Sequence, residues 1–404
     1  MSEPIVIVGG GHAAAQLCAS LAEAGAGPRL QVVCEEPSHP YQRPPLSKSY
    51  LKNAQEGLQL HRDVPWYATH GIQVHLGDPA RTIDRAARTL TLASGKQVAY
   101  GQLVLATGTR ARLLPQFAQP LANVITLRSA ADAAQLRQCL VAQGGSGELT
   151  VLGGGFIGLE VAATARHLGW QVRLLEVAPR LLGRATSPEL SAQVLAHHQG
   201  LGTQVLLGAQ VGDARIADGR VLSLQVNGQD TPVQQLLLGI GAVPEVALAQ
   251  QAGLAVDNGI LVDAAMRSSD PVILAAGDCT SFEYGGRRLR LESVNNASEQ
   301  AKVAAATLLG QPAAYRPTPT FWSDQGGLRL QMVGLWRAGL QAVRRDGAAA
   351  GSFSLFHYDG AQLVAVESAN APMDHMWARK LLEQGVSPTP AQAADASCAL
   401  KSLL

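Results

Sequence analysis

Two clusters of glycine have the sequence context of a turn that binds the phosphates of a nucleotide. Gly9-Gly10-Gly11 follows the apolar run Ile5–Val8, and Gly153-Gly154-Gly155 follows the apolar run Leu149–Leu152. Glycine allows the tight turn after a strand and lets the backbone approach a pyrophosphate, which then lies at the positive N-terminus of the next helix. Each cluster therefore predicts a dinucleotide-binding turn.

The residues after each cluster complete the same pattern. The third small position, which lets helix and strand touch, is Ala14 in the first copy and Gly158 in the second. Each copy ends in an acid that can accept hydrogen bonds from ribose hydroxyls. Glu35 comes 26 positions after Gly9 and Glu176 comes 23 positions after Gly153, close to the roughly 20 positions that the pattern predicts. Because a carboxylate repels a 2′-phosphate, Glu176 predicts a preference for NADH over NADPH.

These residues need a strand, a helix and a second strand to position them. Apolar runs predict strands at 5–8 and 30–35 around a helix that extends to about residue 24, and strands at 149–152 and 171–176 around a helix that extends to 168. Gly25 and Gly169 stand where a helix C-terminus prefers glycine. Two complete copies predict two dinucleotide sites, and hence an enzyme that keeps FAD bound while a nicotinamide nucleotide comes and goes.

The composition narrows the class further. The 404 residues predict two to four domains at about 150 residues each. Lys and Arg (32) nearly balance Asp and Glu (31), which argues against a nucleic-acid partner, and no apolar run approaches the roughly 20 residues of a membrane helix. We expect a cytoplasmic protein that binds no metal and whose five widely spaced cysteines stay reduced.

Further motifs extend the pattern along the chain. They are PYQRPPLSK at 40–48, LVLATG at 103–108, GIG at 239–241, ILAAGD at 273–278, LESVNNA at 291–297 and FWSDQ at 321–325. In this order and spacing the chain resembles the FAD-dependent, NADH-dependent ferredoxin reductases of bacterial aromatic-ring dioxygenase and P450 systems, a branch of the glutathione-reductase-like flavoproteins. The resemblance runs from Ile5 to about Val386, and RPPLSK and WSDQ are its most diagnostic parts.

The resemblance implies an α/β fold with two Rossmann-like dinucleotide-binding domains and a C-terminal α+β domain. The FAD-binding domain is expected at 1–112 and 239–316, the NAD-binding domain at 113–238 and the C-terminal domain at 317–404. Alternating apolar residues at 328–333 and 353–356 predict an antiparallel sheet in that last domain. The Ala-, Pro- and Ser-rich tail from Ser387 predicts loose packing.

The fingerprint and the resemblance together imply the residues that contact FAD. They are Gly9, Gly11, His12, Ala13, Ala14, Glu35, Arg43, Lys48, Ala80, Thr107, Gly108, Arg128, Gly277, Asp278, Val294 and Trp322. The resemblance places Lys48 near the isoalloxazine, where a cation would stabilise the anionic reduced flavin, and has Asp278 bind the ribityl chain. It also implies that the N-terminus of the helix beginning at Val294 faces the flavin C2 carbonyl, and that Trp322 lies beside the isoalloxazine ring.

A second set of residues is expected to contact NAD. It comprises Gly153, Gly155, Phe156, Ile157, Gly158, Glu160, Glu176, Arg184 and Gly241. The resemblance implies that the Glu160 carboxylate meets the nicotinamide carboxamide, and that Arg184 lies near the phosphates. Lys48, Glu160 and Trp322 are thus the candidate catalytic residues, although a solvent-facing glutamate or arginine remains the alternative for Glu160 and Arg184.

The absence of a thiol narrows the reaction. Disulfide reductases of the superfamily carry a cysteine pair beside the flavin, whereas the segment here reads Pro44-Pro45-Leu46-Ser47-Lys48. We therefore expect hydride transfer from NADH to FAD and then single-electron transfer to a [2Fe–2S] ferredoxin. The ferredoxin is expected to feed a terminal oxygenase of the aromatic-ring dioxygenase type. The alternatives are a rubredoxin reductase, an NADH oxidase, or a flavoprotein of mainly binding or signalling role; the oligomeric state stays open.

Two basic clusters are candidates for steering an acidic ferredoxin. One comprises Arg287, Arg288 and Arg290, and the other Arg344 and Arg345. Complementary charge raises the rate of encounter between electron-transfer partners, so one of the clusters is expected to lie at the docking surface. A solvated face without a partner is the alternative.

Overall fold

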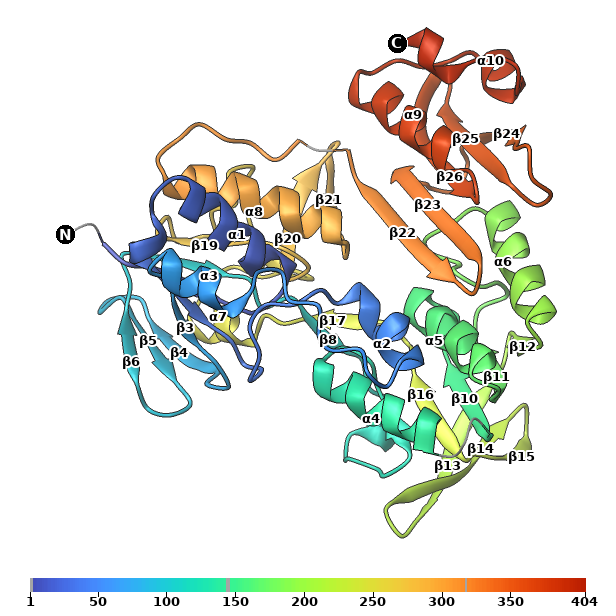
Figure 1. Ribbon diagram of the computed structural model, residues 1–404, viewed down its shortest axis with the longest axis horizontal. Coiled ribbons are helices and arrows are strands. Elements are labelled where there is room, and N and C mark those ends of the chain that lie inside the picture. The colour runs from blue at the N-terminus through green and yellow to red at the C-terminus, as the bar shows by residue number, and fades with distance from the viewer. Residues whose placement is uncertain (1–2, 143–145, 317) are drawn as a thin grey trace. The chain divides into compact units, whose positions relative to one another are not determined.

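The computed structural model describes residues 3–142, 146–316 and 318–404, and the chain divides into two compact units (Figure 1). The first unit comprises Met1–Arg43, Gly57–Arg110 and Ala242–Pro317. The second comprises Pro44–Glu56, Ala111–Gly241 and Thr318–Leu404. The RPPLSK segment is divided between them after Arg43.

A five-stranded parallel sheet forms the centre of the first unit. Its order is β19 (Ile273–Ala275), β7 (Gln102–Leu105), β1 (Ile5–Val8), β2 (Leu30–Val33) and β3 (Gln73–His75). All four residues of β1 are buried, as expected for a strand covered on both faces. Helices α1 (His12–Glu23) and α8 (Val294–Leu308) pack against each other, and buried alanines on both allow close approach.

Smaller elements complete the first unit. One three-stranded sheet contains β4 (Ala80–Asp84), β5 (Thr89–Leu92) and β6 (Gln97–Ala99), and another contains β18 (Ile260–Leu261), β20 (Thr280–Tyr284) and β21 (Arg287–Leu289). The remaining elements are η1 (Gly27–Arg29), α3 (Val64–Thr69), β17 (Ala242–Pro244), α7 (Ala247–Gln251) and most of β8 (Thr109–Ala111).

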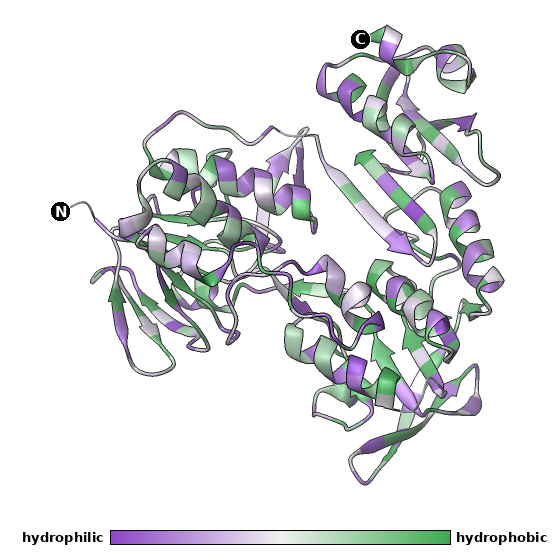
Figure 2. Ribbon diagram, in the orientation of Figure 1, coloured by the Kyte–Doolittle hydropathy of each residue, from purple (hydrophilic) through white to green (hydrophobic). Residues whose placement is uncertain are grey.

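The second unit repeats the parallel arrangement. Its sheet has the order β12 (Gln204–Leu207), β11 (Gln171–Glu176), β10 (Glu148–Leu152), β16 (Gln235–Leu238) and β9 (Val124–Ile125). Accompanying elements are η2 (Pro44–Ser47), α2 (Ser49–Lys52), η3 (Pro115–Phe117), α4 (Ala130–Ala142), α5 (Phe156–His167), α6 (Pro188–Gly200), β13 (Val211–Ala217), β14 (Arg220–Val226) and β15 (Gln229–Pro232). Figure 2 shows hydrophobic residues concentrated in the strands of this sheet.

An antiparallel sheet follows in the same unit. Its order is β22 (Thr320–Gln325), β23 (Leu328–Gly334), β26 (Gln362–Ala369), β25 (Phe353–Asp359) and β24 (Gln341–Asp346), with α9 (Pro372–Glu383), α10 (Pro390–Ala394) and η4 (Leu400–Leu403) after it. The two alternating runs of the sequence are β23 and the first part of β25, so the predicted antiparallel sheet is confirmed. With both parallel sheets present, the predicted α/β fold class is confirmed as well.

The prediction of a loosely packed C-terminal tail is wrong. Ala393 and Leu400 are buried in a hydrophobic cluster with strands of the antiparallel sheet. The buried guanidinium of Arg345 donates to the carbonyl oxygens of Ala393, Asp395, Ala396 and Cys398, and it also pairs with Asp374. Arg345 therefore fixes the tail together with Tyr358, whose hydroxyl donates to Pro388 O, and with the Leu363 N–H, which donates to Ser387 Oγ. Composition cannot reveal these contacts.

Candidate functional site

In the first glycine turn, only glycine fits at position 9, directly after strand β1. Gly9 has φ +131°, and its N–H donates to Val33 O at 2.8 Å. A Cβ on Gly9 would lie 2.1 Å from Ala106 O, well inside contact distance. Gly11 differs, because a Cβ there would meet no protein atom within 4 Å. The open side of Gly11, at the N-cap of the twelve-residue helix α1, fits the approach of a pyrophosphate.

Three segments of the first unit converge on this turn. Gly277 has φ +92°, and its Cβ position lies 3.3 Å from Ala13 Cβ and 3.8 Å from Ala297 Cβ, so the 277–278 turn touches the first turns of α1 and α8. Gln300 Oε1 accepts from Gly277 N (2.8 Å), whereas Gln300 Nε2 is buried without a partner. The structure thus brings the predicted residues Ala13, Gly277 and Val294, the first residue of α8, into one region.

Other predicted FAD residues of the first unit have varied surroundings. His12 packs edge to face on His61, Ala14 is buried, Ala80 begins β4, and Asp278 is half-buried. Thr107 Oγ1 donates to Glu245 O at 2.6 Å, and Gly108 has φ +68°. Arg43 donates to Glu36 Oε1 (2.7 Å) and to Tyr41 Oη (2.8 Å), so its guanidinium is oriented by neighbours in its own loop.

The first copy of the pattern departs from the second at its acid. Val33 O and Leu175 O accept the N–H of the first glycine in their respective copies, so the residue after each of them is equivalent. That residue is Glu176 in the second copy but Cys34 in the first, and Glu35 lies one position later. The strand β2 ends at Val33 rather than at residue 35, and the Glu35 side chain is exposed.

The second glycine turn keeps the sterically required positions. A Cβ on Gly153 would lie 2.4 Å from Gly239 O, and one on Gly158 would lie 2.4 Å from Gly153 O. Gly155, the N-cap of α5, has only Gly239 O near its Cβ position, at 3.8 Å. Helix α5 therefore presents open backbone N–H groups beside Gly155.

The first residues of α5 and the carboxylate of Glu176 lie beside this turn. Ile157 is exposed, and the Phe156 ring packs on Phe321 with a centroid distance of 4.4 Å. Glu176 Oε2 accepts from Gly154 N at 2.6 Å and its Oε1 accepts from Ala178 N at 2.7 Å. The carboxylate is thus fixed beside the glycine turn, at the position where the pattern predicts a ribose.

Arg184 and Gly241 lie close together in the second unit. The Arg184 guanidinium Nη2 is 3.8 Å from the Cβ position of Gly241, which has φ +107°, and the Arg184 side chain is exposed. An exposed cation beside a glycine suits a phosphate.

The buried carboxylate of Glu160 is the centre of a polar cluster. Its Oε2 accepts from Lys48 Nζ (2.5 Å) and from Ser47 Oγ (2.5 Å), and its Oε1 accepts from Ser323 Oγ (2.7 Å). The structure therefore brings two predicted catalytic residues, Lys48 and Glu160, into one ion pair across 112 positions of sequence. The surface-glutamate alternative for Glu160 is wrong, because its side chain is 5% exposed.

Two members of this cluster were missed by the sequence analysis. Ser47 and Ser323 lie inside the RPPLSK and WSDQ segments, so the motifs contained the signal, but a serine in a motif does not say what it binds.

Trp322 is adjacent to Ser323 on β22 and half-buried, and its backbone pairs with Gln331. Arg128, also in the second unit, lies just before α4, where its N–H donates to Asp132.

The cysteines are single thiols within the described chain. Cys34 and Cys279 are the ones nearest the first glycine turn and the Asp278 turn, and both are buried. Burial raises the pKa of Cys34 to about 12 and also raises the pKa of Cys279, so both remain protonated at neutral pH. A protonated buried thiol is a poor nucleophile, which agrees with a reaction that uses no sulfur relay.

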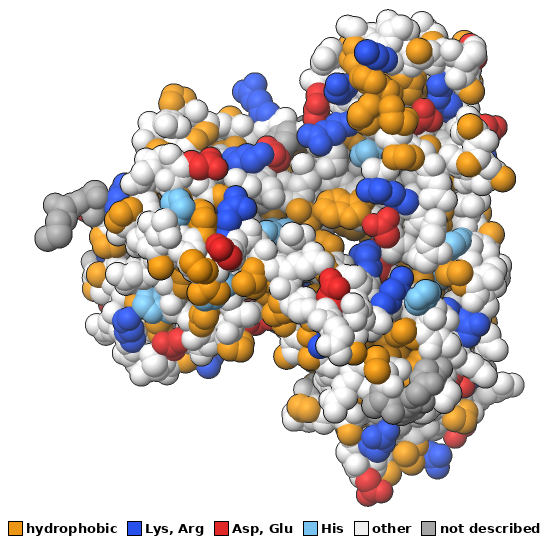
Figure 3. All heavy atoms as spheres, in the orientation of Figure 1, with side chains coloured by type: hydrophobic (Ala, Val, Ile, Leu, Met, Phe, Trp, Pro, Cys, Tyr) orange, Lys and Arg blue, Asp and Glu red, His pale blue; other side chains and the backbone are white. Residues whose placement is uncertain are grey.

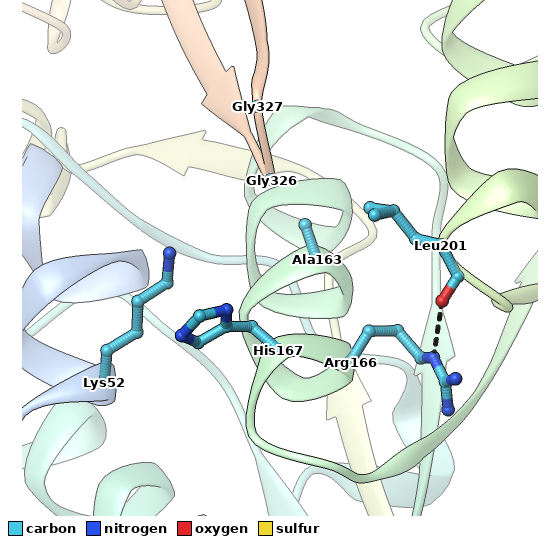
Figure 4. A pocket seen from close by; sticks show the side chains of 7 residues that line it. All are labelled: Lys52, Ala163, Arg166, His167, Leu201, Gly326 and Gly327. Carbon is cyan, nitrogen blue, oxygen red and sulfur yellow. Dashed lines mark hydrogen bonds between the residues drawn. The ribbon is translucent and has the colours of Figure 1, made fainter.

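A pocket of about 330 Å³ lies at the far end of α5 from the glycine turn (Figure 4). Lys52, Arg166 and His167 line it together with Leu201 and the Gly326-Gly327 turn. Arg166 Nε donates to Leu201 O at 2.8 Å, so this cation satisfies a carbonyl at the C-terminus of α6. Cations at helix C-termini are favourable without any ligand, and the pocket does not contribute to the nucleotide site.

Comparison with known proteins identifies the class. Residues 3–301 match the family model of the pyridine nucleotide-disulphide oxidoreductases, and residues 320–404 match the reductase C-terminal model. The chain belongs to this oxidoreductase family, whose members imply FAD and NAD(H) as cofactors, and both predicted cofactors are confirmed.

Individual relatives narrow the resemblance. The chain is 40% identical to rhodocoxin reductase from Rhodococcus erythropolis, over 98% of this chain and 93% of that protein. It is 40% identical to the ferredoxin–NAD(+) reductase component of the anthranilate 1,2-dioxygenase system from Burkholderia cepacia, with both chains fully covered. The crystal structure of the covalent putidaredoxin reductase–putidaredoxin complex matches with a TM-score of 0.93 at 36% identity, over 100% of this chain and 98% of that one. The resemblance to oxygenase-coupled ferredoxin reductases is confirmed.

The described residues lack two features of other protein classes. None of the helices in that part of the chain is both long enough and apolar enough to cross a bilayer. Among the same residues, no group of three or more His, Cys, Asp or Glu side chains is arranged to hold a metal ion.

Proposed function

We propose that the protein is an NADH:ferredoxin oxidoreductase that passes single electrons to a small [2Fe–2S] ferredoxin, which in turn supplies a terminal oxygenase. The observation that carries this proposal is the combination of two dinucleotide-binding turns with buried, protonated thiols at Cys34 and Cys279. Without a sulfur relay in the chain, electrons from the reduced flavin have to go to an external acceptor. The relative that is the ferredoxin–NAD(+) reductase component of the anthranilate 1,2-dioxygenase system, aligned over the full length of both chains, supports the same acceptor.

The residues at both turns suit the two nucleotides. The open side of Gly11 and the N-termini of α1 and α8 suit the FAD pyrophosphate and flavin, while Gly155 and Glu176 suit NADH. Bound FAD would supply hydride acceptance and single-electron release, which is chemistry that side chains lack. The role of the chain is to hold and orient the two nucleotides.

The Lys48–Glu160 pair is the proposed centre of the nicotinamide site. The Lys48 ammonium is 21% exposed and stabilises negative charge that develops near it, while Glu160 offers acceptors for a carboxamide N–H. Trp322, Arg43, Asp278, Arg128, Ala80 and Arg184 retain the proposed contacts given by the resemblance. The domain division at 1–112 with 239–316, 113–238 and 317–404, and a cytoplasmic location, belong to the same proposal.

The two basic clusters are not equal candidates for docking a ferredoxin. Arg345 is buried, and Arg344 pairs with Glu189 and Asp346, so this second cluster is already neutralised. Arg287 and Arg288 on β21 are exposed, and we propose this strand as the steering cluster, although Arg290 pairs with Glu292. On the face seen in Figure 3, basic and acidic side chains are interspersed.

A rubredoxin reductase is the second candidate function. The chain is 34% identical to the rubredoxin–NAD(+) reductase of Pseudomonas putida, over 91% of this chain and 96% of that protein. Only the acceptor distinguishes the two functions, so the test is to follow NADH oxidation by the FAD-loaded protein with each acceptor. A [2Fe–2S] ferredoxin should accelerate NADH oxidation at least about tenfold over oxygen alone. Equal rates with and without ferredoxin would indicate an NADH oxidase, and acceleration by rubredoxin alone would select the second candidate.

A further inference from the structure

Behind Glu160, the buried hydrogen bonds form one directed chain within the second unit. His198 Nε2 lies 2.9 Å from Gln325 Oε1, Gln325 Nε2 donates to Ser323 Oγ at 3.0 Å, and Ser323 Oγ donates to Glu160 Oε1 at 2.7 Å. Burial lowers the pKa of His198 to about 4, so the ring is neutral at pH 7. Because Gln325 uses its Nε2 to donate to Ser323, its Oε1 faces the ring as an acceptor, which assigns the single imidazole proton to Nε2. Every donor in the chain therefore points toward Glu160.

The chain crosses three elements and is sealed from water. His198 lies on α6, Ser323 and Gln325 lie on β22, and Glu160 lies on α5. Exposure is 0% for His198 and Gln325 and 1% for Ser323. Water cannot replace a lost partner at these atoms, and a buried polar group left unpaired is costly, so each member fixes the orientation of the next.

The two oxygens of Glu160 have different surroundings as a result. Oε1 is held by Ser323, which is itself held from behind by Gln325. Oε2 accepts hydrogen bonds from Ser47 Oγ and from Nζ of the partly exposed Lys48. The Ser323 contact is thus the rigid side of the carboxylate, and Lys48 is the partner that can exchange with a ligand.

We propose that Ser323 and Gln325, supported by His198, are positioning residues that set the carboxylate plane of Glu160 for the nicotinamide carboxamide. This inference rests on the proposed function, because it requires that Glu160 meets the nicotinamide. It differs from a general packing role in its consequence: loss of the Ser323 hydroxyl frees Glu160 to rotate toward Lys48, which disturbs nucleotide binding and hydride transfer while the flavin stays bound.

The test compares Ser323→Ala with a matched control, Ser354→Ala, in the FAD-loaded protein. Ser354 is a fully buried serine of the same sheet whose hydroxyl pairs with Ser368 at 2.9 Å, away from Glu160. Three quantities are measured for each variant: the melting temperature, the affinity for NAD+ by titration calorimetry, and the rate constant of flavin reduction at saturating NADH. Gln325→Met is the second variant, should Ser323→Ala fold poorly.

The expected outcome separates position from stability. Ser323→Ala should weaken NAD+ binding and slow flavin reduction by about tenfold each, the loss expected for one hydrogen bond to a charged group, and Gln325→Met should show smaller losses in the same direction. Ser354→Ala should lower the melting temperature by a similar amount and leave both nucleotide readouts within about twofold of the unaltered protein. Equal nucleotide readouts in Ser323→Ala and Ser354→Ala would overturn the positioning role alone. An unaltered protein that NADH does not reduce would instead overturn the proposed function.

Discussion

Replacing Glu176 with glutamine tests the proposed nucleotide preference at one atom. The substitution keeps the size of the side chain and removes its charge. The two carboxylate oxygens of Glu176 accept from Gly154 N and Ala178 N, and the one amide oxygen of glutamine can accept from only one of them. Two unit charges about 4 Å apart interact by ~1 kcal/mol in water and ~4 kcal/mol at an effective dielectric constant of 20. Glu176 is half-buried, so its repulsion of a 2′-phosphate falls between these limits.

This range sets the size of the expected change. Removing 1 to 4 kcal/mol of repulsion should lower the preference for NADH over NADPH by about fivefold to several hundredfold. NADH itself should bind about fivefold more weakly, because a hydrogen bond to a neutral amide is worth roughly 1 kcal/mol less than one to a charged group. The assay is stopped-flow reduction of the bound flavin over a range of concentrations of each nucleotide.

A matched control is available on the neighbouring strand. Glu148 begins β10, at the opposite end of that strand from the glycine turn, and pairs with Arg173. Glu148→Gln should therefore leave the nucleotide preference unchanged. If Glu176→Gln retains the preference of the unaltered protein while Glu148→Gln behaves the same way, then Glu176 does not contact the ribose and the reasoning is refuted.

Three further predictions concern the first turn, the tail and acid stability. Gly11→Ala should fold with an unchanged melting temperature and bind FAD at least about tenfold more weakly in equilibrium dialysis, because its Cβ would fill the space left open for the pyrophosphate. Gly9→Ala should instead lose soluble folded protein, because its Cβ meets Ala106 O. An unchanged FAD affinity in Gly11→Ala would contradict the assignment of that space to the pyrophosphate. Arg345→Met should lower the free energy of unfolding by roughly 3 kcal/mol and expose the chain after residue 387 to limited proteolysis, since it leaves Asp374 and several carbonyls unpaired. Burial lowers the pKa of His375 from 6.5 to about 4, so between these pH values the unfolded chain binds a proton that the folded chain does not. The free energy of unfolding should therefore fall by roughly 1 to 2 kcal/mol as the pH drops from 6.5 to 4. In urea titrations, this fall should be smaller for His375→Gln.

The sequence predicts the two nucleotide turns closely because their signal is local. Apolar runs and glycines locate β1, α1, β10 and α5 to within a residue or two, since strand, turn and helix are adjacent in the chain. The local pattern does not locate the position equivalent to Glu176 in the first copy. Cys34 and Glu35 are neighbours, and only the backbone hydrogen bond from Gly9 to Val33 fixes which of them is equivalent to Glu176.

Features that depend on distant residues are not predictable in this way. Lys48 and Glu160 were both singled out through the family resemblance, but nothing in their spacing shows that they meet. The Ser323–Gln325–His198 chain needs the packing of β22 on α5 and α6, so sequence periodicity gives no sign of it. The packing of the tail escapes prediction for the same reason, because its hydrogen bonds come from distant residues of the sheet, among them Arg345 about 50 positions earlier.

The division of the chain into two units has a practical consequence for dissecting the protein. The polypeptide passes between the units five times, after residues 43, 56, 110, 241 and 317. No shortened gene that encodes one uninterrupted stretch can therefore yield either unit whole. Separating them requires rejoining three pieces with new connecting loops, and ordinary truncation series should return fragments that aggregate rather than half-molecules that fold.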